Sequence, residues 1–554
     1  MGCPRNKQKV GKRVGLLPEM STVVSIAITN AKIWTGNDSL PWAEALAVRN
    51  DSIVYIGSQA GLQPLLDKTT QLIDAQGNMV TPGFIDCHVH LLEGGYRLTA
   101  VQLNEATSKA DFVKRIANYT PTLSKNAWMT GGNWDETRWG GILPEANWVD
   151  SVTGTHPVWL NRVDGHSGLA NTAAMKAAGI TAATPNPAGG VIVRDAKGNP
   201  TGVFRDNAMS LIEKVVAPVT EAEKDKALQA AMDFIASKGV TSVHHMGTWD
   251  ELAVFRRAHQ NNNLKTRIYA NVPLETWVRL RDEIAQTGRG DNWLRIGGLK
   301  GFADGSLGSH TAAMKKGYTN AAKNKGIFVT SLDTLYHQIG LADRADLNVM
   351  IHAIGDKSIF ELLYIFEAVG LENGDKDRRF RIEHAQHIDS MDIPRFAGLG
   401  VIPSMQPYHL IDDGRWAQKY IGAERAKTSY AFQDLLTSGA KVVFGSDWFV
   451  APPTPLEGIY AAVTRRTLDD KNPKGWVPAQ KISLNAALKA YTKDAAYASF
   501  EERIKGTLEV GKLADFVLLG GDLTQMAPEN LRNVPILMTV VGGRVVYQLP
   551  KPVQ

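Results

Sequence analysis

Two histidines, His88 and His90, stand one residue apart at the end of an apolar run that predicts a buried strand. Side chains alternate along a strand, so both imidazoles face the same side and can share one metal ion. On its own, a His-x-His pair is equally typical of two strand histidines satisfied by hydrogen bonds. His352, His384 and Asp447 change that balance, because each lies where another predicted strand ends. Four imidazoles and one carboxylate at strand ends predict a metal centre.

A lysine joins this set in the segment Gly297-Gly-Leu-Lys-Gly-Phe-Ala-Asp304. An unpaired lysine that points into a barrel is costly, so the amine of Lys300 is either neutral or partnered. A neutral amine beside two cations can react with carbon dioxide to form a carbamate, whose two oxygens bridge two metal ions. The alternative is a lysine that faces outward to solvent.

Strands must position these residues, and the chain offers eight apolar runs that alternate with helical patterns. Such alternation is typical of parallel βαβ units, and eight units predict an α/β fold, a (β/α)₈ barrel. Catalytic groups in such barrels project from the carboxyl ends of the strands. The predicted strands are residues 83–89, 241–245, 267–271, 298–303, 348–352, 380–384, 400–404 and 441–447.

Short β-type segments with Asn, Gly and Asp turns occupy both ends of the chain. They predict a composite β-sandwich from residues 23–82 and 505–554, with the barrel over residues 83–504. A stretch of about 91–218 is too long for a connection between a strand and a helix, so we expect an insertion over the barrel mouth. Residues 1–22 are expected to form a separate basic tail.

The composition excludes several classes of protein. Apolar residues at 44% and charged residues at 21% are typical of a folded, soluble chain. The net charge of +5 comes mainly from the basic tail, which gives no support for nucleic-acid binding. Two cysteines cannot form a disulfide framework, and no run of about 18 apolar residues offers a membrane span. We therefore expect a cytoplasmic protein with a small-molecule substrate and without nucleic-acid or membrane partners, and a homodimer stays open.

Longer segments around the candidate ligands form a specific combination. They are Thr81-Pro-Gly-Phe-Ile-Asp-Cys-His-Val-His90, Asn161-Arg-Val-Asp-Gly-His-Ser-Gly-Leu-Ala-Asn171, Lys300-Gly-Phe-Ala-Asp-Gly-Ser-Leu-Gly-Ser309, Ile351-His-Ala-Ile-Gly-Asp356, Arg381-Ile-Glu-His-Ala-Gln-His387 and the Gly-Ser-Asp447 end of the last strand. Together they resemble the amidohydrolase superfamily, in particular the YtcJ-like branch (amidohydrolase family 3), which includes N-substituted formamide deformylases. The resemblance runs from about residue 23 to residue 547.

The resemblance implies a metal-dependent hydrolase with a defined division of ligands. His88 and His90 would hold one metal ion with Asp447, His352 and His384 would hold a second, and a carboxylated Lys300 would bridge them. Imidazole and carboxylate ligands suit Zn²⁺, with Fe, Mn, Co or Ni as alternatives, and the site has room for one or two ions.

The implied reaction is hydrolysis of a C–N amide bond in an N-substituted formamide or another N-acyl compound. A bound ion lowers the pKa of its water to about 7, and Asp447 would accept the proton and deliver it to the departing nitrogen. One rival is deamination of a ring, which in this superfamily commonly works with one metal and without the bridging lysine. The other is a non-catalytic scaffold, which would have lost ligands.

Four further residues are candidates for substrate binding. His166 lies in the insertion and suits an oxyanion partner or a catalytic substrate anchor, or it is a loop histidine that caps backbone groups. Asp304 either orients a metal ligand or only begins a turn. Trp134 and Trp448 favour an apolar or aromatic substrate, although aromatic residues near loops also serve as packing. The aromatic residues predicted at the mouth are Trp134, Trp139, Tyr408, Trp416, Trp448 and Phe449.

Overall fold

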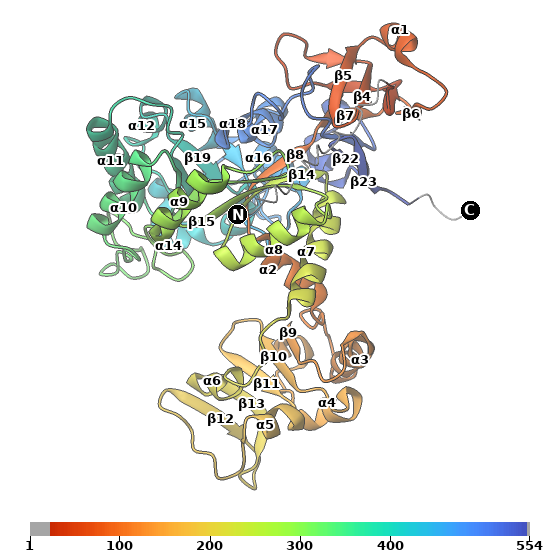
Figure 1. The fold of residues 1–554 in the computed structure, drawn as a ribbon. Helices are drawn as coiled ribbons and strands as arrows, with labels where there is room; N and C mark the ends of the chain where they lie inside the picture. The colour runs from red at the N-terminus through yellow and green to blue at the C-terminus, as the bar shows by residue number, and fades with distance from the viewer. Residues whose placement is uncertain (1–22, 551–554) are drawn as a thin grey trace, which may run out of the picture.

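The computed structural model describes residues 23–550, and its centre is a barrel of eight parallel strands (Figure 1). The strands are β8 (Phe84–Val89), β14 (Val240–Met246), β15 (Arg267–Pro273), β16 (Leu294–Phe302), β17 (Asn348–Ala353), β18 (Arg381–His384), β19 (Ile402–Met405) and β20 (Val443–Phe444). Their spatial order follows the chain from β8 to β20. The barrel closes where the Asp447 amide donates to the His88 carbonyl at 2.7 Å and the His90 amide donates to the Trp448 carbonyl at 2.6 Å. The predicted (β/α)₈ barrel is confirmed.

Helices that follow the strands cover the outside of the barrel (Figure 1). They are α7 (Glu221–Ala236), α8 (Trp249–Gln260), α9 (Trp277–Thr287), α10 (Leu332–Arg344), α11 (Asp356–Asn373), α12 (Ile393–Gly398), α15 (Phe432–Thr437), α16 (Pro455–Thr464), α17 (Leu484–Ala490) and α18 (Lys493–Ala498). Helix α7 begins with a capping box, in which the Thr220 hydroxyl accepts from the Glu223 amide and the Glu223 carboxylate accepts from the Thr220 amide. This cap satisfies amides that the first helical turn leaves without partners.

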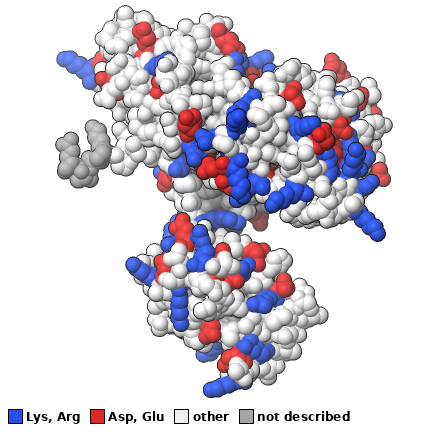
Figure 2. Space-filling model, turned by 180° about the vertical axis from the view of Figure 1, so that it is seen from behind, with Lys and Arg blue, Asp and Glu red and all other residues white. Residues whose placement is uncertain are grey.

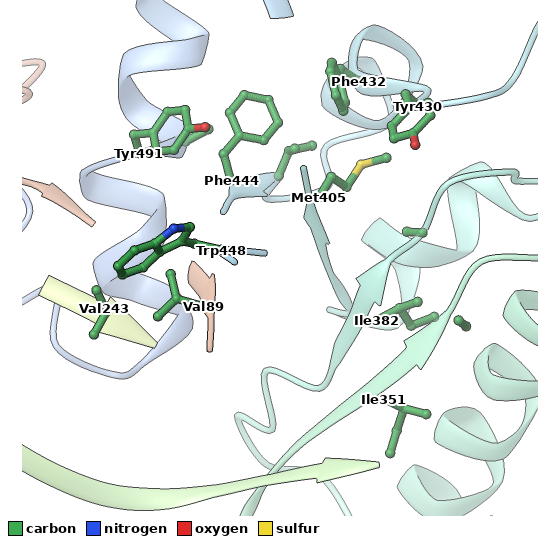
Figure 3. Packing of buried hydrophobic residues seen from close by; sticks show 14 of the residues in the cluster. Val89, Val243, Ile351, Ile382, Met405, Tyr430, Phe432, Phe444, Trp448 and Tyr491 are labelled. Atoms are coloured by element: carbon green, nitrogen blue, oxygen red, sulfur yellow. The ribbon is translucent and has the colours of Figure 1, made fainter. Parts of the chain in front are cut away.

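The outward faces of the strands bury apolar side chains against these helices (Figure 3). Phe444 of β20 has its ring centroid 5.0 Å from that of Phe432 in α15 and 5.5 Å from that of Tyr491 at the end of α17. All three rings are almost wholly buried. Because this packing fixes the strands from outside, the inner face and the carboxyl ends of the strands are free to carry polar groups.

The two chain ends form a pair of packed sheets beside the barrel (Figure 1). One sheet has the order β5 (Ser52–Gly57), β4 (Ala45–Arg49), β1 (Ile26–Thr29) and β6 (Gln71–Asp74); the other has the order β23 (Arg544–Gln548), β22 (Ile536–Val541), β21 (Phe516–Leu519), β7 (Met79–Pro82), β2 (Lys32–Trp34) and β3 (Trp42–Ala43). The N- and C-terminal segments meet where Thr81 of β7 pairs with Val517 of β21. The composite sandwich is confirmed, whereas the basic tail predicted for residues 1–22 lies outside the described residues.

The insertion forms a separate lobe with its own sheet (Figure 1). Its strands, in spatial order, are β12 (Gly190–Arg194), β13 (Pro200–Asp206), β11 (Ser167–Ala170), β10 (Val158–Arg162) and β9 (Met129–Trp134), and its helices are α3 (Lys109–Tyr119), α4 (Ala146–Thr153), α5 (Thr172–Ala177) and α6 (Ser210–Glu213). Helix α2 (Leu91–Thr99), which precedes the lobe, packs on α7 of the barrel. The lobe stands away from the barrel body (Figure 1). Of the stretch 91–218, which was expected to cover the barrel mouth, only Glu93 of α2 is among the described residues that line the cavity containing His88 and His90.

Charged side chains of both signs are interspersed on the face shown in Figure 2. This mixture agrees with the small net charge expected for the chain outside its basic tail. Among residues 23–550, no helix combines the length and the apolar character that a membrane span requires.

A buried ion pair joins the barrel to the sandwich. The Arg267 guanidinium of β15 contacts both oxygens of Asp515, at 2.6 and 2.8 Å, and only 1% and 6% of these residues are exposed. Asp515 also accepts from the Gly542 amide at 2.8 Å.

We predict that Asp515→Asn costs about 3–5 kcal/mol of stability, because it leaves the Arg267 charge buried without a counter-charge. The melting temperature followed by circular dichroism should fall by several degrees. The matched control is Asp233→Asn, which breaks the exposed pair with Lys265 and should cost at most about 1 kcal/mol. Equal melting temperatures for the two variants would contradict this role of Asp515.

Candidate metal centre

Six predicted residues converge at one end of the barrel. His88 lies in β8, His90 immediately before α2, Lys300 in β16, His352 in β17, His384 at the end of β18 and Asp447 three residues after β20. All six line a single cavity of about 670 Å³. They lie in or just after strands of the same parallel barrel, so the carboxyl ends of these strands bring their side chains to the same place.

His88 is held by a buried carboxylate behind it. Its Nδ1 lies 2.6 Å from Glu383 Oε2, and Glu383 in turn forms an ion pair with Arg381 at 2.7 Å. The tautomer that donates from Nδ1 to Glu383 leaves Nε2 free toward the cavity. Burial, helped by the nearby Lys300 charge, holds the pKa of His88 well below its usual range. The imidazole is therefore neutral, which is the form that binds a metal ion.

Asp447 faces the two histidines of the His-Val-His segment with one oxygen. Its Oδ1 lies 3.3 Å from His90 Nε2 and 3.6 Å from His88 Nε2. Burial alone would raise the pKa of Asp447, but the hydrogen bond from His90 and the surrounding imidazoles bring it well below its usual range. The three side chains place their donor atoms within 4.8 Å of one another, so an imidazole–imidazole–carboxylate set suited to a divalent ion is assembled.

Lys300 points into the cavity and is only 5% exposed, which contradicts the alternative of an outward-facing lysine. Its Nζ lies 3.2 Å from His88 Nε2. Burial lowers the pKa of Lys300 to about 8, although the Glu383 and Asp447 carboxylates oppose the shift. The shift raises the neutral fraction of this amine near neutral pH, and the neutral form is the one that forms a carbamate.

His352 and His384 lie side by side, with ring centroids 4.4 Å apart. His352 Nε2 donates to the Gly305 carbonyl at 3.0 Å, and His384 Nδ1 donates to Gln406 Oε1 at 2.9 Å. Burial and the Lys300 charge lower the pKa of His352 to about 4, and burial together with His352 holds that of His384 well below its usual range. Each ring is thus neutral and keeps one nitrogen unused by these contacts.

Two ligand positions require left-handed backbone at residues other than glycine. The φ angles are +74° at His384 and +60° at Asp447, a region that side chains with a Cβ rarely adopt. Such conformations cluster at functional sites, where the surrounding fold compensates the strain. Here they turn each side chain into the cavity at the point where its strand ends.

The other four predicted site residues are not among those that line the cavity. His166 is in the lobe, with its side chain 75% exposed and Nδ1 3.1 Å from Asp206. Trp134 is fully buried in the core of the lobe and donates to the Leu160 carbonyl at 2.7 Å.

Asp304 and Trp448 sit close behind the cavity. Asp304 accepts from backbone amides of three residues and from the Ser358 hydroxyl, and its Oδ1 lies 3.6 Å from His352 Nε2. It therefore anchors the loop beside a predicted ligand. Trp448 packs against Phe234 and Gly94 and is 7% exposed.

The cavity wall contains further residues besides the predicted ligands. Phe302, Trp416 and Phe449 supply aromatic surface, of which the last two belong to the aromatic set predicted at the mouth. His409 and Glu93 are further polar groups in the wall. His409 follows β19 by four residues, in Met405-Gln-Pro-Tyr-His409, so its place after a predicted strand was the available signal.

Comparison with known protein families agrees with this geometry. The family model described as "Amidohydrolase family" matches residues 71–547. The chain belongs to the amidohydrolase family. It is a hydrolytic enzyme, and the resemblance read from its motifs is confirmed.

Relatives of this amidohydrolase cover nearly its whole length. The Protein LONG AFTER FAR-RED 3 of Arabidopsis thaliana is 39% identical over 96% of this chain and 93% of its own. The putative amidohydrolase YtcJ of Bacillus subtilis is 31% identical over 91% and 96%, and the N-substituted formamide deformylase of Arthrobacter pascens is 25% identical over 96% and 99%. A crystal structure of an uncharacterized metal-dependent hydrolase from Pyrococcus horikoshii superposes with a TM-score of 0.74 at 27% identity, covering 91% of this chain and 98% of the other.

We predict that Glu383→Gln weakens metal binding by about 10–100-fold, because the amide no longer supplies the charge that fixes the His88 tautomer. Equilibrium competition with a chelator measures this, with circular dichroism to verify folding. The control is Glu361→Gln, which removes a surface partner of Lys357. An affinity unchanged from wild type would show that Glu383 does not act through His88.

Proposed function

We propose that this amidohydrolase cleaves a C–N amide bond of a small molecule, with an N-substituted formamide or another N-acyl compound as its substrate. The observation that carries the proposal is the convergence of His88, His90, Lys300, His352, His384 and Asp447 on one cavity. The Arthrobacter pascens relative is an N-substituted formamide deformylase, which supports the choice of a formamide.

One or two divalent ions are proposed as cofactors, and Zn²⁺ is the preferred candidate. The donor set fits, because neutral imidazoles and an ionised carboxylate are the ligands that Zn²⁺ prefers. His88, His90 and Asp447 would hold one ion, and His352 and His384 the other, with a carboxylated Lys300 between them. When bound, such ions make water nucleophilic near neutral pH and polarise a carbonyl group.

Asp447 is proposed to carry the proton. Its carboxylate is ionised at neutral pH, so it can accept a proton as water adds to the amide carbon. It then donates this proton to the departing nitrogen, since an amine leaves poorly unless it is protonated. His90 Nε2 lies 3.3 Å from Asp447 Oδ1, a separation that suits two ligands of the same ion.

The rest of the cavity wall indicates what kind of substituent the amide nitrogen of the substrate carries. Phe302, Trp416 and Phe449 offer apolar aromatic surface beside the polar floor. A substituent with an apolar or aromatic body on the amide nitrogen would bury against these rings. We place this part of the substrate toward the open side of the cavity.

Deamination of a ring is the second candidate function. Lys300 argues against it, because a buried lysine beside His88, in the cavity that His352 and His384 also line, is best explained as a bridge between two ions. Screening N-formyl, N-acetyl and N-carbamoyl amines for released amine tests the proposal directly. Release of ammonia from ring amines, with none of the amides cleaved, would favour the deaminase instead.

We predict that Lys300→Ala lowers bound metal by about one equivalent and abolishes turnover, because the bridging group is lost. A short carboxylic acid such as propionate should restore part of the activity by occupying the space. Lys419→Ala, on an exposed helix position, serves as the control. Two metal equivalents and normal turnover in Lys300→Ala would refute the bridge.

Asp447→Asn is predicted to keep the fold and much of the metal while kcat falls about 10²- to 10⁴-fold, because an amide cannot carry the proton. Anilides of graded leaving-group pKa, tested on fully metallated enzymes, measure the effect. Substrates whose nitrogen needs less protonation should lose less activity. A loss that is uniform across the series would mean that Asp447 only positions metal.

A further inference from the structure

His409 is an imidazole of the cavity wall that the ligand assignment leaves without a role. It lies in α13 (Pro407–Asp413), the short helix that directly follows β19. Its ring is nearly parallel to that of His384, with centroids 6.4 Å apart and an angle of 7° between the planes. The side chain is 13% exposed and borders the same cavity as the predicted ligands.

The Nε2 atom of His409 is buried and forms no hydrogen bond with any described residue. A buried polar atom without a partner is costly, so an unused imidazole nitrogen beside a reactive centre needs a reason. Its nearest acidic neighbour is Asp447 Oδ2, at 3.9 Å. That distance is slightly too long for a hydrogen bond, and catalytic contacts of this kind often tighten only when substrate is bound.

The two oxygens of Asp447 therefore face different partners. Oδ1 lies near His90 and His88, at 3.3 and 3.6 Å, whereas Oδ2 lies toward His409. A carboxylate that must face the metal ligands with one oxygen and exchange a proton with the other needs its rotation about the Cβ–Cγ bond fixed. An imidazole N–H directed at Oδ2 would provide that restraint.

We propose that His409 is a positioning residue, whose Nε2–H hydrogen-bonds Asp447 Oδ2 during turnover and fixes the orientation of this carboxylate. The inference rests on the proposed function, in which Asp447 carries the proton. It adds a seventh residue, from the short helix after the seventh strand, to the machinery of the site.

Metal ligation is the competing role, because donor atoms of His384, His409 and Asp447 lie within 4.8 Å of one another. Two donors bound tetrahedrally to one Zn²⁺ at about 2.0–2.1 Å are separated by roughly 3.4 Å. The His90 and His88 contacts with Asp447 fit that separation, and the His409 contact is longer and involves the other oxygen. The geometry thus favours a hydrogen-bonding partner over a ligand.

The test compares His409→Leu and His409→Gln in the full-length, metal-loaded enzyme. Leucine removes the N–H, and glutamine restores an N–H donor at a similar reach. His259→Gln is the matched control, since it alters an imidazole–carboxylate pair at the surface, with Asp291 at 2.9 Å. Metal equivalents, melting temperature, kcat and KM are measured for each variant on an amide that the wild type hydrolyses.

We expect His409→Leu to keep its metal and melting temperature, with KM within about threefold and kcat lowered about 10²-fold, as for loss of a group that acts on the transition state. His409→Gln should recover at least about tenfold of that loss. Unchanged kcat in His409→Leu overturns the proposal, and so does the loss of a metal equivalent, which would make His409 a ligand.

A measurement without substrate separates this inference from the proposed function. In the Co²⁺-substituted protein, visible absorption reports how Asp447 binds the metal. A changed spectrum in His409→Leu at full Co²⁺ occupancy supports the positioning role even if the wild type cleaves no amide. An unchanged spectrum together with unchanged kcat refutes it, whereas a wild type inactive on every amide counts only against the proposed reaction.

Discussion

The site depends on the contacts of the buried Glu383 carboxylate, which forms an ion pair with Arg381 and accepts a hydrogen bond from His88. All three side chains are buried, and removing a charge from water costs several kcal/mol unless it is paired and hydrogen-bonded. Arg381 meets that requirement by also donating to the Cys87 carbonyl at 2.7 Å and to the Ser404 hydroxyl at 2.9 Å. The guanidinium thus ties together three strands of the barrel. Glu383 transmits this rigidity to His88, and through it to the cavity.

The barrel turns this fixed centre into a site because its strands are parallel. The carboxyl ends of all the strands lie at the same rim of the barrel, so residues at the ends of different strands meet there without any long loop. The left-handed backbone at His384 and Asp447 then turns these two side chains into the cavity. The sandwich and the barrel helices contribute by packing the outer face of the strands, which leaves the inner face for polar groups. Stability and chemistry therefore occupy opposite faces of the same strands.

Much of this arrangement could be predicted from the sequence, because strand periodicity is local. The eight apolar runs located the strands, and the polar residues at their ends located the cavity. Glu383 escaped notice because it precedes His384 directly, and alternation along a strand would turn it to the opposite side. The left-handed φ of +74° at His384 breaks that alternation and lets both residues serve the site. Nothing in the pattern around Trp134 indicated that it would fill the core of the lobe.

The central claim is that the six convergent side chains hold divalent metal. Anomalous diffraction from crystals grown with Zn²⁺, recorded on both sides of the zinc absorption edge, tests it most directly. We predict one peak among His88, His90 and Asp447, a second beside His352 and His384, and density for a carbamate on Lys300 between them. Peaks confined to other parts of the molecule, with this cavity empty of metal, would contradict it.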